Sequence, residues 1–410
     1  MKILLINHYA GSPEMGMEFR PYYFSREWIN QGHEVNIIAA DFSHLRRINP
    51  QVNQDFEKEN IDGINYYWVK TNRYDSNGVK RSLTMFEFIS KLLFKTKWIV
   101  NELNPDVVIC SSTYPLDTYV GQRIKKMSKK HVKLIHEVHD MWPISPIEIG
   151  GMSPNHPFIR IMQCGENSFC RNSDVIVSLL PAAKNYFIKH GMNDTKFKHI
   201  PNGVVLEEWI NYQKLPKKIS DHLIKQKKDG KFNICFFGSI NKTYNLDSLI
   251  EAVIKLNDKN IVITFIGNGT DKKELIKKAS KYPESFVFFD PIPKKCIPDL
   301  FNYIDASFVG AKSQKIFRFG ICMNKLFDSM MGGKPILYMV DAPNDYIEKY
   351  SCGISIKNQQ VDSLVNGLID LLRLSDADRN LMGVNGRKAV IDFFNYKVLA
   401  KSFLNIMEER

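Results

Sequence analysis

Several features that define common protein classes are missing from this sequence of 410 residues. No segment has the ~18 to 20 uninterrupted apolar residues that a membrane-spanning helix needs. The apolar run at the N-terminus is too short for a secretory signal, so we expect a cytosolic protein. The seven cysteines are scattered and include no Cys-x-x-Cys pair. This odd, dispersed set indicates neither a disulfide framework nor a zinc site, and core thiols are expected.

Metal-ligand and cofactor motifs are missing as well. The ten histidines lack the His-x3-His spacing that brings two imidazoles to one face of a helix. The only Asp-x-Asp pattern, Asp376 to Asp378, follows Ser375 and predicts a capped helix start rather than a cation site. The Gly-x-Gly-x-x-Gly motif is absent, which disfavours a nicotinamide or flavin cofactor. We therefore expect chemistry without a cofactor or a metal.

The charge balance is positive, since 56 Lys and Arg residues against 44 Asp and Glu residues give a formal net charge of +12. Such a balance suits an anionic partner, which could be nucleic acid, an acidic membrane surface or a phosphorylated small molecule. A lysine-rich surface also serves solubility. Charge alone does not choose between these functions.

Short β-branched runs alternate with helical stretches along the chain, which predicts mostly parallel sheets with helices on both faces. A Lys-rich linker near 209–230 separates two such sets. We therefore expect an α/β fold of two doubly wound, Rossmann-like domains facing across a cleft. The expected strands are 2–7, 34–39, 64–69, 106–110, 132–137, 174–179 and 196–200, then 231–237, 261–266, 285–289, 304–309, 335–340 and 353–357.

The segment 318–335 carries the most specific local signal. Glycine at 320 lets the backbone approach a ligand, and the first free amides of a helix near Asn324 and Lys325 can hold a pyrophosphate. Asp328, one turn further on, can accept hydrogen bonds from a ribose diol. The segment therefore predicts a site for a nucleoside diphosphate, although its Gly-Gly-Lys-Pro end is also an ordinary helix stop.

A basic, aromatic-rich segment at 80–100 has the periodicity of an amphipathic helix. It could be an ordinary packed helix with its lysines in water, or a helix that lies on a membrane surface. The membrane interpretation places near the lipid Lys91, Phe94, Lys95, Lys97 and Trp98.

With these residues in view, the chain resembles the retaining glycosyltransferases of family 4, which have the GT-B fold. It is most similar to the branch that builds bacterial O-antigen and capsule repeats, including N-acetylfucosamine transferases. The resemblance extends over nearly the whole chain. The matching stretches are 7–28, 32–35, 137–143, 201–204, 266–269, 324–335 and 383–387.

The resemblance implies a division into two domains. Residues 1–205 form an acceptor-side domain, on which the C-terminal helix 395–410 packs back. Residues 206–394 form the domain that binds the nucleotide sugar. A strand-to-helix loop containing Gly16 is an approach point for phosphate or sugar on the first domain.

The Glu-x7-Glu motif of the family falls on Gly320 and Asp328, so only the second acid is kept, as aspartate. The contact to ribose therefore carries over to Asp328, while the role of the first acid on the donor sugar does not. The backbone of Gly320 and Ile321 and the helix start at Asn324 remain donor-binding candidates.

The cations of the family are replaced. Its glycine-arginine pair meets Gly238 and Ser239 here, and its lysine falls on Asn245. A leaving nucleoside diphosphate needs its growing negative charge stabilised. The candidates for this task are Lys242, Lys325 and Arg318, each of which could equally be a solvated surface cation.

His139 and Asp140 follow an apolar strand, and in the family this histidine lies beside the donor sugar and the acceptor. The alternative for His139 is a hydrogen-bonded loop histidine; Asp140 and the rigid Trp-Pro pair that follow favour the site. Glu18 and Arg20 are weaker acceptor-side candidates, because charges in a first turn often just complement the helix dipole.

The sequence-based hypothesis is a metal-independent, retaining glycosyltransferase that moves a hexose or N-acetylhexosamine derivative from a nucleotide sugar, expected to be UDP-linked. The expected acceptor is a polyprenyl-diphosphate-linked saccharide of surface polysaccharide synthesis, reached by peripheral contact with the anionic inner face of the cytoplasmic membrane. Catalytic candidates are His139, Asp140, Lys242 and Lys325; donor-binding candidates are Gly16, Gly238, Ser239, Gly267, Arg318, Gly320, Ile321, Asn324 and Asp328; acceptor candidates are Glu18 and Arg20.

Two other functions stay open at this point. A UDP-sugar 2-epimerase of the same fold would share the two domains but would want carboxylates at the sugar ring. A nucleic-acid-binding protein would fit the positive charge, although the chain has no basic, aromatic-interleaved recognition motif. We expect no nucleic-acid partner.

Overall fold

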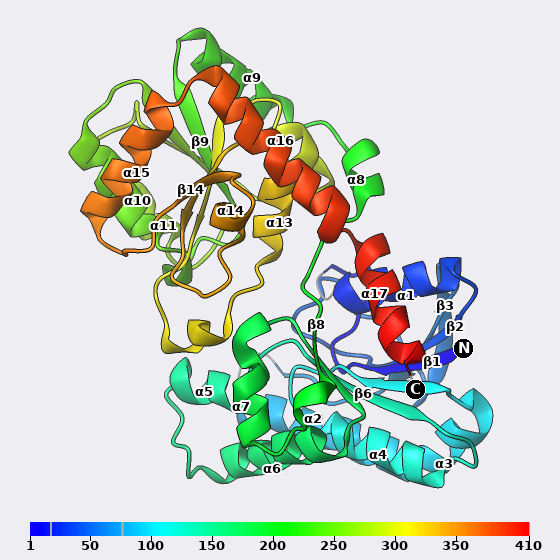
Figure 1. Ribbon diagram of the computed structural model, residues 1–410. Coiled ribbons are helices and arrows are strands. Elements are labelled where there is room, and N and C mark those ends of the chain that lie inside the picture. Colours follow the sequence, from blue (N-terminus) through cyan, green and yellow to red (C-terminus); the bar gives the residue numbers. More distant parts are fainter. Residues whose placement is uncertain (17–18, 75–77, 410) are drawn as a thin grey trace. The chain divides into compact units, whose positions relative to one another are not determined.

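The computed structural model describes residues 1–16, 19–74 and 78–409 (Figure 1). The chain divides into two compact units. Unit 1 is Met1–Pro201 with Tyr396–Arg410, and unit 2 is Asn202–Asn395. The division lies close to the boundary expected at 205/206, and the C-terminal segment belongs to unit 1. Both units are parallel-sheet, Rossmann-like α/β domains, which confirms the expected fold class of each.

Unit 1 is built on one mostly parallel sheet. Its strands within the described residues are β1 (Lys2–Ile6), β2 (Glu34–Ala40), β3 (Glu57–Ile61), β4 (Ile64–Val69), β5 (Val107–Cys110), β6 (Lys133–Val138), β7 (Val175–Ser178) and β8 (Phe197–His199). Their order is β3-β4-β2-β1-β5-β6-β7-β8. The central strands are buried along almost their whole length, because helices cover both faces of the sheet.

The sequence-based prediction missed β3. This strand pairs antiparallel with β4 at the edge of the sheet, and its sequence Glu-Lys-Glu-Asn-Ile is charged rather than apolar. The two strands are joined by Asp62 and Gly63, which both have positive φ angles of 51° and 86°. An Asp-Gly pair is a strong hairpin signal, and charged side chains are usual on an exposed edge strand.

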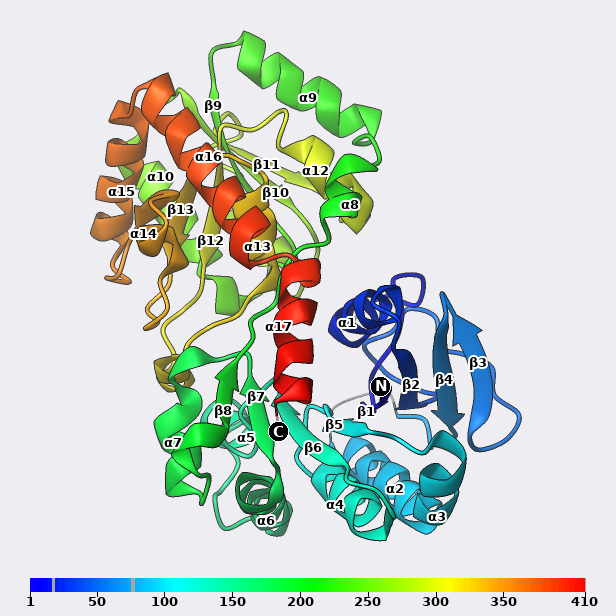
Figure 2. The ribbon, with the colours of Figure 1, turned by 45° about the vertical axis from the view of Figure 1, so that its right-hand side comes forward.

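Two layers of helices enclose the sheet of unit 1. The helical elements are α1 (Phe19–Asn30), α2 (Val79–Phe94), α3 (Thr96–Trp98), η1 (Ile99–Leu103), α4 (Asp117–Met127), α5 (Ile144–Glu148), α6 (Pro157–Asn172), η2 (Pro181–Ala183), α7 (Lys184–Lys189), η3 (Asp194–Lys196) and α17 (Tyr396–Glu408). Figure 2 shows α17 alongside α1. Their contact is aromatic, with ring centroids of Phe24 and Phe403 5.5 Å apart, and Trp28 Nε1 donates to the carbonyl of Ala400.

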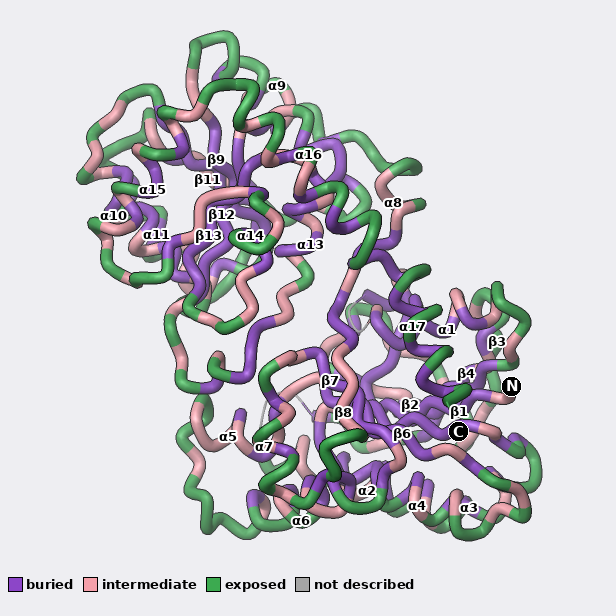
Figure 3. Tube along the Cα trace, in the orientation of Figure 1, coloured by how far each residue is buried: buried purple, intermediate pink, exposed green. Residues whose placement is uncertain are grey.

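Unit 2 lies entirely within the described residues and has a fully parallel sheet. Its strands are β9 (Phe232–Phe237), β10 (Ile261–Ile266), β11 (Phe286–Phe289), β12 (Ala306–Gly310), β13 (Ile336–Met339) and β14 (Gly353–Ser355). They are ordered β11-β10-β9-β12-β13-β14. Figure 3 shows that the strands are largely buried while the connecting loops are exposed. All strands expected in both units are present, with ends shifted by no more than two residues.

Helices cover both faces of the second sheet. They are α8 (Leu206–Ile210), α9 (Lys217–Lys228), η4 (Lys242–Tyr244), α10 (Leu246–Leu256), α11 (Lys272–Ala279), η5 (Lys294–Cys296), α12 (Ile297–Leu300), η6 (Lys315–Phe319), α13 (Asn324–Met331), α14 (Tyr346–Lys349), α15 (Val361–Arg373) and α16 (Asp376–Phe393). The Ser375 side chain accepts a hydrogen bond from the amide of Asp378, so the Asp-x-Asp pattern is a capped helix start, as expected.

The basic amphipathic segment forms α2 and α3. The apolar face of α2 packs into the core of unit 1 through Met85, Phe88 and Leu92. None of the described helices is long and apolar enough to cross a membrane. The side chains assigned to a membrane contact divide into two groups. Phe94 is 90% exposed, whereas Trp98 packs against the ring of Phe56.

Candidate active site

In unit 2 the first part of the site lies at the carboxyl ends of β9 and β10. Gly238 follows β9 and Gly267 follows β10, and the amide of Gly238 donates to the carbonyl of Ile266 at 2.9 Å. A Cβ on Gly267 would lie 1.9 Å from the carbonyl oxygen of Gly238, so only glycine fits there. The two loops are therefore packed backbone against backbone at the edge where α/β folds bind ligands.

The side chain of Lys325 lies beside this edge. Its ammonium is 3.3 Å from the ring centroid of Tyr244 and 4.2 Å from that of Phe236. A Cβ on Gly238 would be 3.0 Å from the same Nζ atom. The ammonium makes no hydrogen bond among the described residues, and burial lowers the pKa of Lys325 to about 7. A buried ammonium held only by aromatic faces lacks the hydrogen-bond acceptors that an anion could supply.

Helix α13 begins at Asn324, and its N-cap residue Met323 supplies no side-chain acceptor. Gly320, three residues earlier, is buried and has a φ angle of 106°. The amide of Ile321 donates to Asn344 Oδ1 at 2.8 Å, and Asn344 Nδ2 donates back to the carbonyl of Ile321 at 2.7 Å. The backbone of Ile321 is therefore already paired, and the amides at the helix start remain the better ligand donors.

Asp328 lies one turn along α13 from Lys325. Its carboxylate accepts no hydrogen bond from the described part of the chain. Burial raises the pKa of Asp328 to about 6; the nearby Lys294 lowers it and Glu208 raises it. An unpaired, half-buried carboxylate is an acceptor available to a ligand hydroxyl.

The three other candidates near this edge are exposed. Ser239 is exposed, and so is Lys242, which forms no ion pair among the residues described. The guanidinium of Arg318 contacts the backbone of its own helical turn, where Nη1 donates to the carbonyl of Lys315 at 2.6 Å. Asn245, at the family's lysine position, is buried and donates to Gln359 Oε1 at 3.2 Å.

In unit 1, His139 follows β6 and belongs to a buried polar network. Its Nε2 lies 3.0 Å from Glu137 Oε2 and 2.8 Å from Ser111 Oγ, and Ser111 Oγ donates to the same carboxylate oxygen at 2.6 Å. Burial alone would raise the pKa of Glu137. The Arg20 guanidinium, His139 and the hydrogen bonds outweigh it and hold that pKa well below its usual range.

Because an ionised carboxylate only accepts hydrogen bonds, Glu137 favours the imidazole tautomer with the proton on Nε2. Nδ1 of His139 forms no hydrogen bond among the described residues, so it is the nitrogen able to accept one from a substrate hydroxyl. Sequence reasoning did not select Glu137 or Ser111. A glutamate within a strand expected to be buried was the available signal, because a charge is rarely buried without a partner.

Arg20 has a different position from the one expected of an acceptor contact. It is 5% exposed, and its Nη2 lies 2.9 Å from Glu137 Oε1. Nη1 and Nη2 also donate to the carbonyls of Pro201 and Ile200, at 2.6 and 2.9 Å. Arg20 is therefore a positioning residue behind Glu137. Glu18, the other acceptor candidate, lies outside the described residues.

The remaining candidates of unit 1 have local contacts. Asp140 Oδ1 accepts from the amide of Met141 at 2.8 Å and from Ser145 Oγ at 2.5 Å, which are the contacts of a turn-stabilising carboxylate. Gly16 has a φ angle of 74°, and a Cβ there would lie 2.9 Å from Arg47 Nε. The catalytic role of Asp140 and the binding role of Gly16 stay predictions.

Among the described residues there is one cluster of possible metal ligands, and the spacing of these residues in the sequence did not indicate it. The ligand atoms of Cys110, Asp117 and His136 lie within 4.8 Å of one another in the core of unit 1. The Cys110 thiol donates to the carbonyl of Asp117, and burial raises its pKa well above the usual value. The cluster is buried in the core, where Asp117 Oδ1 and His136 Nδ1 have no hydrogen-bond partner among the described residues. It belongs to a different unit from Lys325 and Asp328.

The fold is that of the GT-B glycosyltransferases. Residues 15–208 match the family model "Glycosyltransferase Family 4", and residues 217–389 match "Glycosyl transferases group 1". Together the two models span most of the chain, which belongs to the GT-B glycosyltransferases.

Individual relatives are distant. An uncharacterized glycosyltransferase of Methanocaldococcus jannaschii is 24% identical over 309 residues, covering 74% of this chain and 75% of the relative. Sucrose-phosphate synthase of Thermosynechococcus elongatus has a TM-score of 0.72 at 13% identity, covering 99% of this chain and 98% of its own. HepE of Anabaena, solved with UDP and glucose, has a TM-score of 0.65 at 14% identity over 100% of both chains. At these identities the solved structures establish the fold.

Proposed function

We propose that this glycosyltransferase uses a nucleoside-diphosphate sugar, with UDP as the nucleotide, and transfers a hexose or N-acetylhexosamine derivative. The observation that carries the proposal is the pair on α13. The Lys325 ammonium has no hydrogen-bond partner among the described residues, and the Asp328 carboxylate lies one turn away. The ammonium suits the diphosphate, and the carboxylate suits the ribose diol. HepE, solved with UDP and glucose, is a structural relative whose ligand fits this assignment.

The transfer we propose retains the anomeric configuration. The acceptor hydroxyl oxygen bonds to the anomeric carbon on the face from which the phosphate oxygen departs, and that phosphate oxygen receives the acceptor proton. Negative charge then grows on the diphosphate, where Lys325, Lys242 and the amides at the start of α13 stabilise it. No metal is needed in this scheme. His139 accepts a hydrogen bond at Nδ1 from a hydroxyl of the sugar or the acceptor.

The acceptor we propose is a polyprenyl-diphosphate-linked saccharide used for surface polysaccharide. Such an acceptor lies in a membrane, and none of the described helices spans one, so we propose a contact at the membrane surface. Helix α2 offers a contact, because Val79, Leu83 and Phe94 are 77%, 59% and 90% exposed. Exposed Lys95 and Lys97 follow at its end. Apolar side chains flanked by lysines are typical of contacts with anionic lipid.

Calorimetric titration of UDP tests the donor assignment. We expect binding in the presence of EDTA, and a tenfold to hundredfold loss in Lys325→Met, since a hydrogen bond to a charged group contributes about 1.5 to 3 kcal/mol. The matched control is Lys273→Met on exposed α11, which should bind like the wild type. Strict dependence on Mg²⁺ or Mn²⁺, or equal affinity of both variants, would reject the proposed site. Conversion of a UDP-sugar without acceptor would instead reveal an epimerase.

A further inference from the structure

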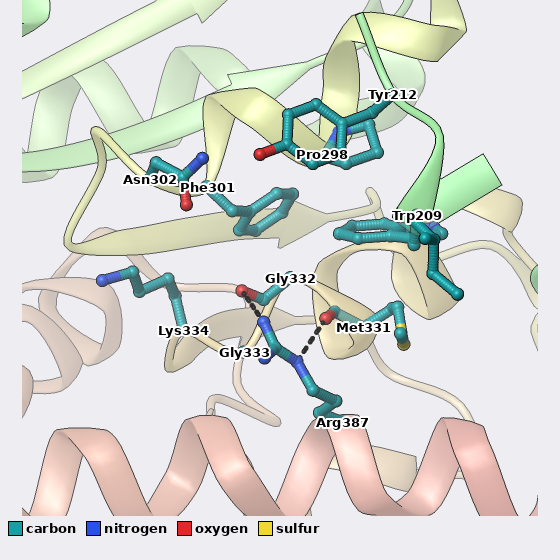
Figure 4. Close-up of a pocket in the computed structure, with 11 residues that line it drawn as sticks. Trp209, Tyr212, Pro298, Phe301, Asn302, Met331, Gly332, Gly333, Lys334 and Arg387 are labelled. Carbon is teal, nitrogen blue, oxygen red and sulfur yellow. Dashed lines mark hydrogen bonds between the residues drawn. The ribbon is translucent and has the colours of Figure 1, made fainter. Parts of the chain in front are cut away.

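Unit 2 has a pocket of about 430 Å³ at the C-terminal end of α13. Figure 4 shows aromatic side chains on one side of it and the glycine pair with Arg387 on the other. The residues that line the pocket are Trp209, Ile210, Tyr212, Pro298, Phe301, Asn302, Met331, Gly332, Gly333, Lys334 and Arg387. All of them belong to unit 2.

The topology separates this pocket from the donor candidates. Helix α13 starts after the carboxyl end of β12 and ends shortly before the first residue of β13. Lys325 lies in its first turn, whereas Met331 and Gly332 lie at its end. The pocket is therefore at the amino-terminal edge of the sheet, and Gly238 and Gly267 are at the carboxyl-terminal edge. The residues proposed for nucleotide binding do not line it.

Aromatic rings form the apolar wall of the pocket. The ring centroids of Trp209 and Phe301 are 5.8 Å apart. The glycine pair packs closely against its neighbours: a Cβ on Gly332 would be 2.1 Å from the Phe301 ring, and Gly333 has a φ angle of 68°. Aromatic pocket walls suit a planar ring.

Two cations line the pocket. The guanidinium of Arg387 is held in place because Nε donates to the carbonyl of Met331 at 3.1 Å and Nη2 donates to that of Gly332 at 3.4 Å. These bonds use only part of its five N–H donors. Lys334 is half-buried, and its ammonium makes no hydrogen bond or ion pair within unit 2 as described. Burial, Lys227 and Arg387 lower the pKa of Lys334, and Asp305 raises it.

We propose that this pocket binds a small aromatic anion. The planar ring lies against Trp209 and Phe301, and its phosphate or carboxylate pairs with Lys334, with Arg387 adding a second positive charge. The half-buried ammonium then gains the acceptors that the chain does not provide, and the ligand covers apolar surface that is otherwise in water. This inference does not depend on the proposed function, since none of these residues takes part in the proposed transfer.

Calorimetric titration tests the pocket with three probes, 1-naphthyl phosphate, 1-naphthoate and inorganic phosphate. Saturating UDP is included to occupy the donor site. We expect at least one naphthyl probe to bind, and inorganic phosphate to bind at least tenfold more weakly. Lys334→Met should weaken the naphthyl probe at least tenfold without unfolding the chain, because burial already disfavours the ammonium. Lys273→Met, on the exposed face of α11, should stay within twofold of the wild type.

Tryptophan fluorescence gives a second readout. The chain has five tryptophans, and quenching by the naphthyl probe should disappear in a folded Trp209→Phe variant. Repeating the titration on Lys325→Met without UDP keeps the result independent of the proposed donor site. No binding of either naphthyl probe, or equal binding by Lys334→Met and wild type, would overturn the proposal. So would binding that UDP displaces and that Lys325→Met abolishes, because the probe would then occupy the donor site.

Discussion

The Nε2 atom of His139 lies 3.0 Å from Oε2 of Glu137. Behind this contact, Arg20 pairs with the other carboxylate oxygen at 2.9 Å, with side chains that are 5% and 2% exposed. An ion pair and a hydrogen bond thus connect Arg20 on α1, through Glu137, to the proposed catalytic imidazole of His139. This connection holds the ring in one orientation and favours one tautomer.

Glu137→Gln should therefore lower kcat for transfer by at least tenfold and leave UDP affinity within twofold. The amide keeps the shape but offers His139 a neutral acceptor or a donor, so the Nε2–H tautomer is less favoured. Glu166→Gln is the matched control. Glu166 is also buried in unit 1, and burial raises its pKa to about 8, so it is largely neutral at pH 7. An equal fall in kcat for both variants would assign the effect to folding instead.

His139→Ala should reduce transfer by ~10²-fold or more, the usual contribution of a positioned polar or acid–base group. UDP affinity should change little, because His139 is on unit 1 and the nucleotide residues are on unit 2. Kinetics with a radiolabelled sugar, alongside UDP titration, separate the two effects. His131→Ala is the control, since His131 is an exposed histidine of the same unit. Turnover within about twofold of wild type in the folded variant would make His139 structural.

The sequence was sufficient for the expected strands, because these are local patterns, while the ligand edge stays a prediction. Unbroken β-branched runs predict buried parallel strands, and a glycine-rich turn before a helix predicts an approach point for phosphate. The one missed strand, β3, lies at an edge where charged side chains carry no apolar signal. The Asp62-Gly63 pair, which is typical of a hairpin turn, was the local sequence signal for this strand.

The partners of the site residues were not accessible in the same way. Arg20 and Glu137 are 117 positions apart, and only the pairing of strands and the packing of α1 brings them together. The sequence could not distinguish a guanidinium in water from one that is 5% exposed. Lys325 was one of three equal cations by sequence, and its isolation between two aromatic rings became visible only in the structure.

UDP affinity should depend on pH in opposite directions for the two residues of α13. Lys325 has a lowered pKa of about 7, so its charged form is lost as pH rises through 7. Asp328 has a raised pKa of about 6, so its carboxylate is lost as pH falls through 6. Affinity should therefore be highest between about pH 6 and 7 and fall on both sides.

Variants assign the two limbs of this profile. Lys325→Met should flatten the alkaline limb and Asp328→Asn the acidic one. The terminal phosphate of UDP also titrates near pH 6, but it affects wild type and variants alike, so their difference isolates the carboxylate. Calorimetric titration from pH 5 to 9 provides the measurement. Profiles of unchanged shape in both variants would show that neither group contacts the nucleotide.

The same two substitutions should raise the stability of the ligand-free protein. Burial disfavours the ionised form of each group, so at pH 8 Asp328→Asn removes an unfavourable buried carboxylate. Because the pKa of Asp328 is raised in the folded chain, the free-energy cost of burying its carboxylate is present above about pH 6. This cost disappears as the pH falls toward the lower pKa that the group has in the unfolded chain. The gain in melting temperature from Asp328→Asn should therefore be larger at pH 8 than at pH 5. Reduced binding together with increased stability is the mark of a functional residue.

Membrane contact should depend on the end of α2 rather than on the whole basic segment. Lys91 lies 3.2 Å from Asp55 and 3.4 Å from Glu87, so its charge is partly neutralised within the protein. The exposed side chains at the C-terminal end of α2 and just beyond it are Phe94, Lys95 and Lys97. Each lysine near an anionic surface contributes about 1 kcal/mol, and the phenylalanine adds buried apolar area.

The triple variant Phe94→Ser/Lys95→Glu/Lys97→Glu should lose flotation with anionic vesicles at low salt, while wild type floats and is released as salt increases. The control Lys277→Glu/Lys281→Glu makes the same charge change on exposed lysines of unit 2 and should float like wild type. If the control also stays in the pellet, net charge rather than α2 drives the association. If the triple variant floats like wild type, or if wild type does not float, α2 is an ordinary packed helix and the lipid-linked acceptor must reach the enzyme without it.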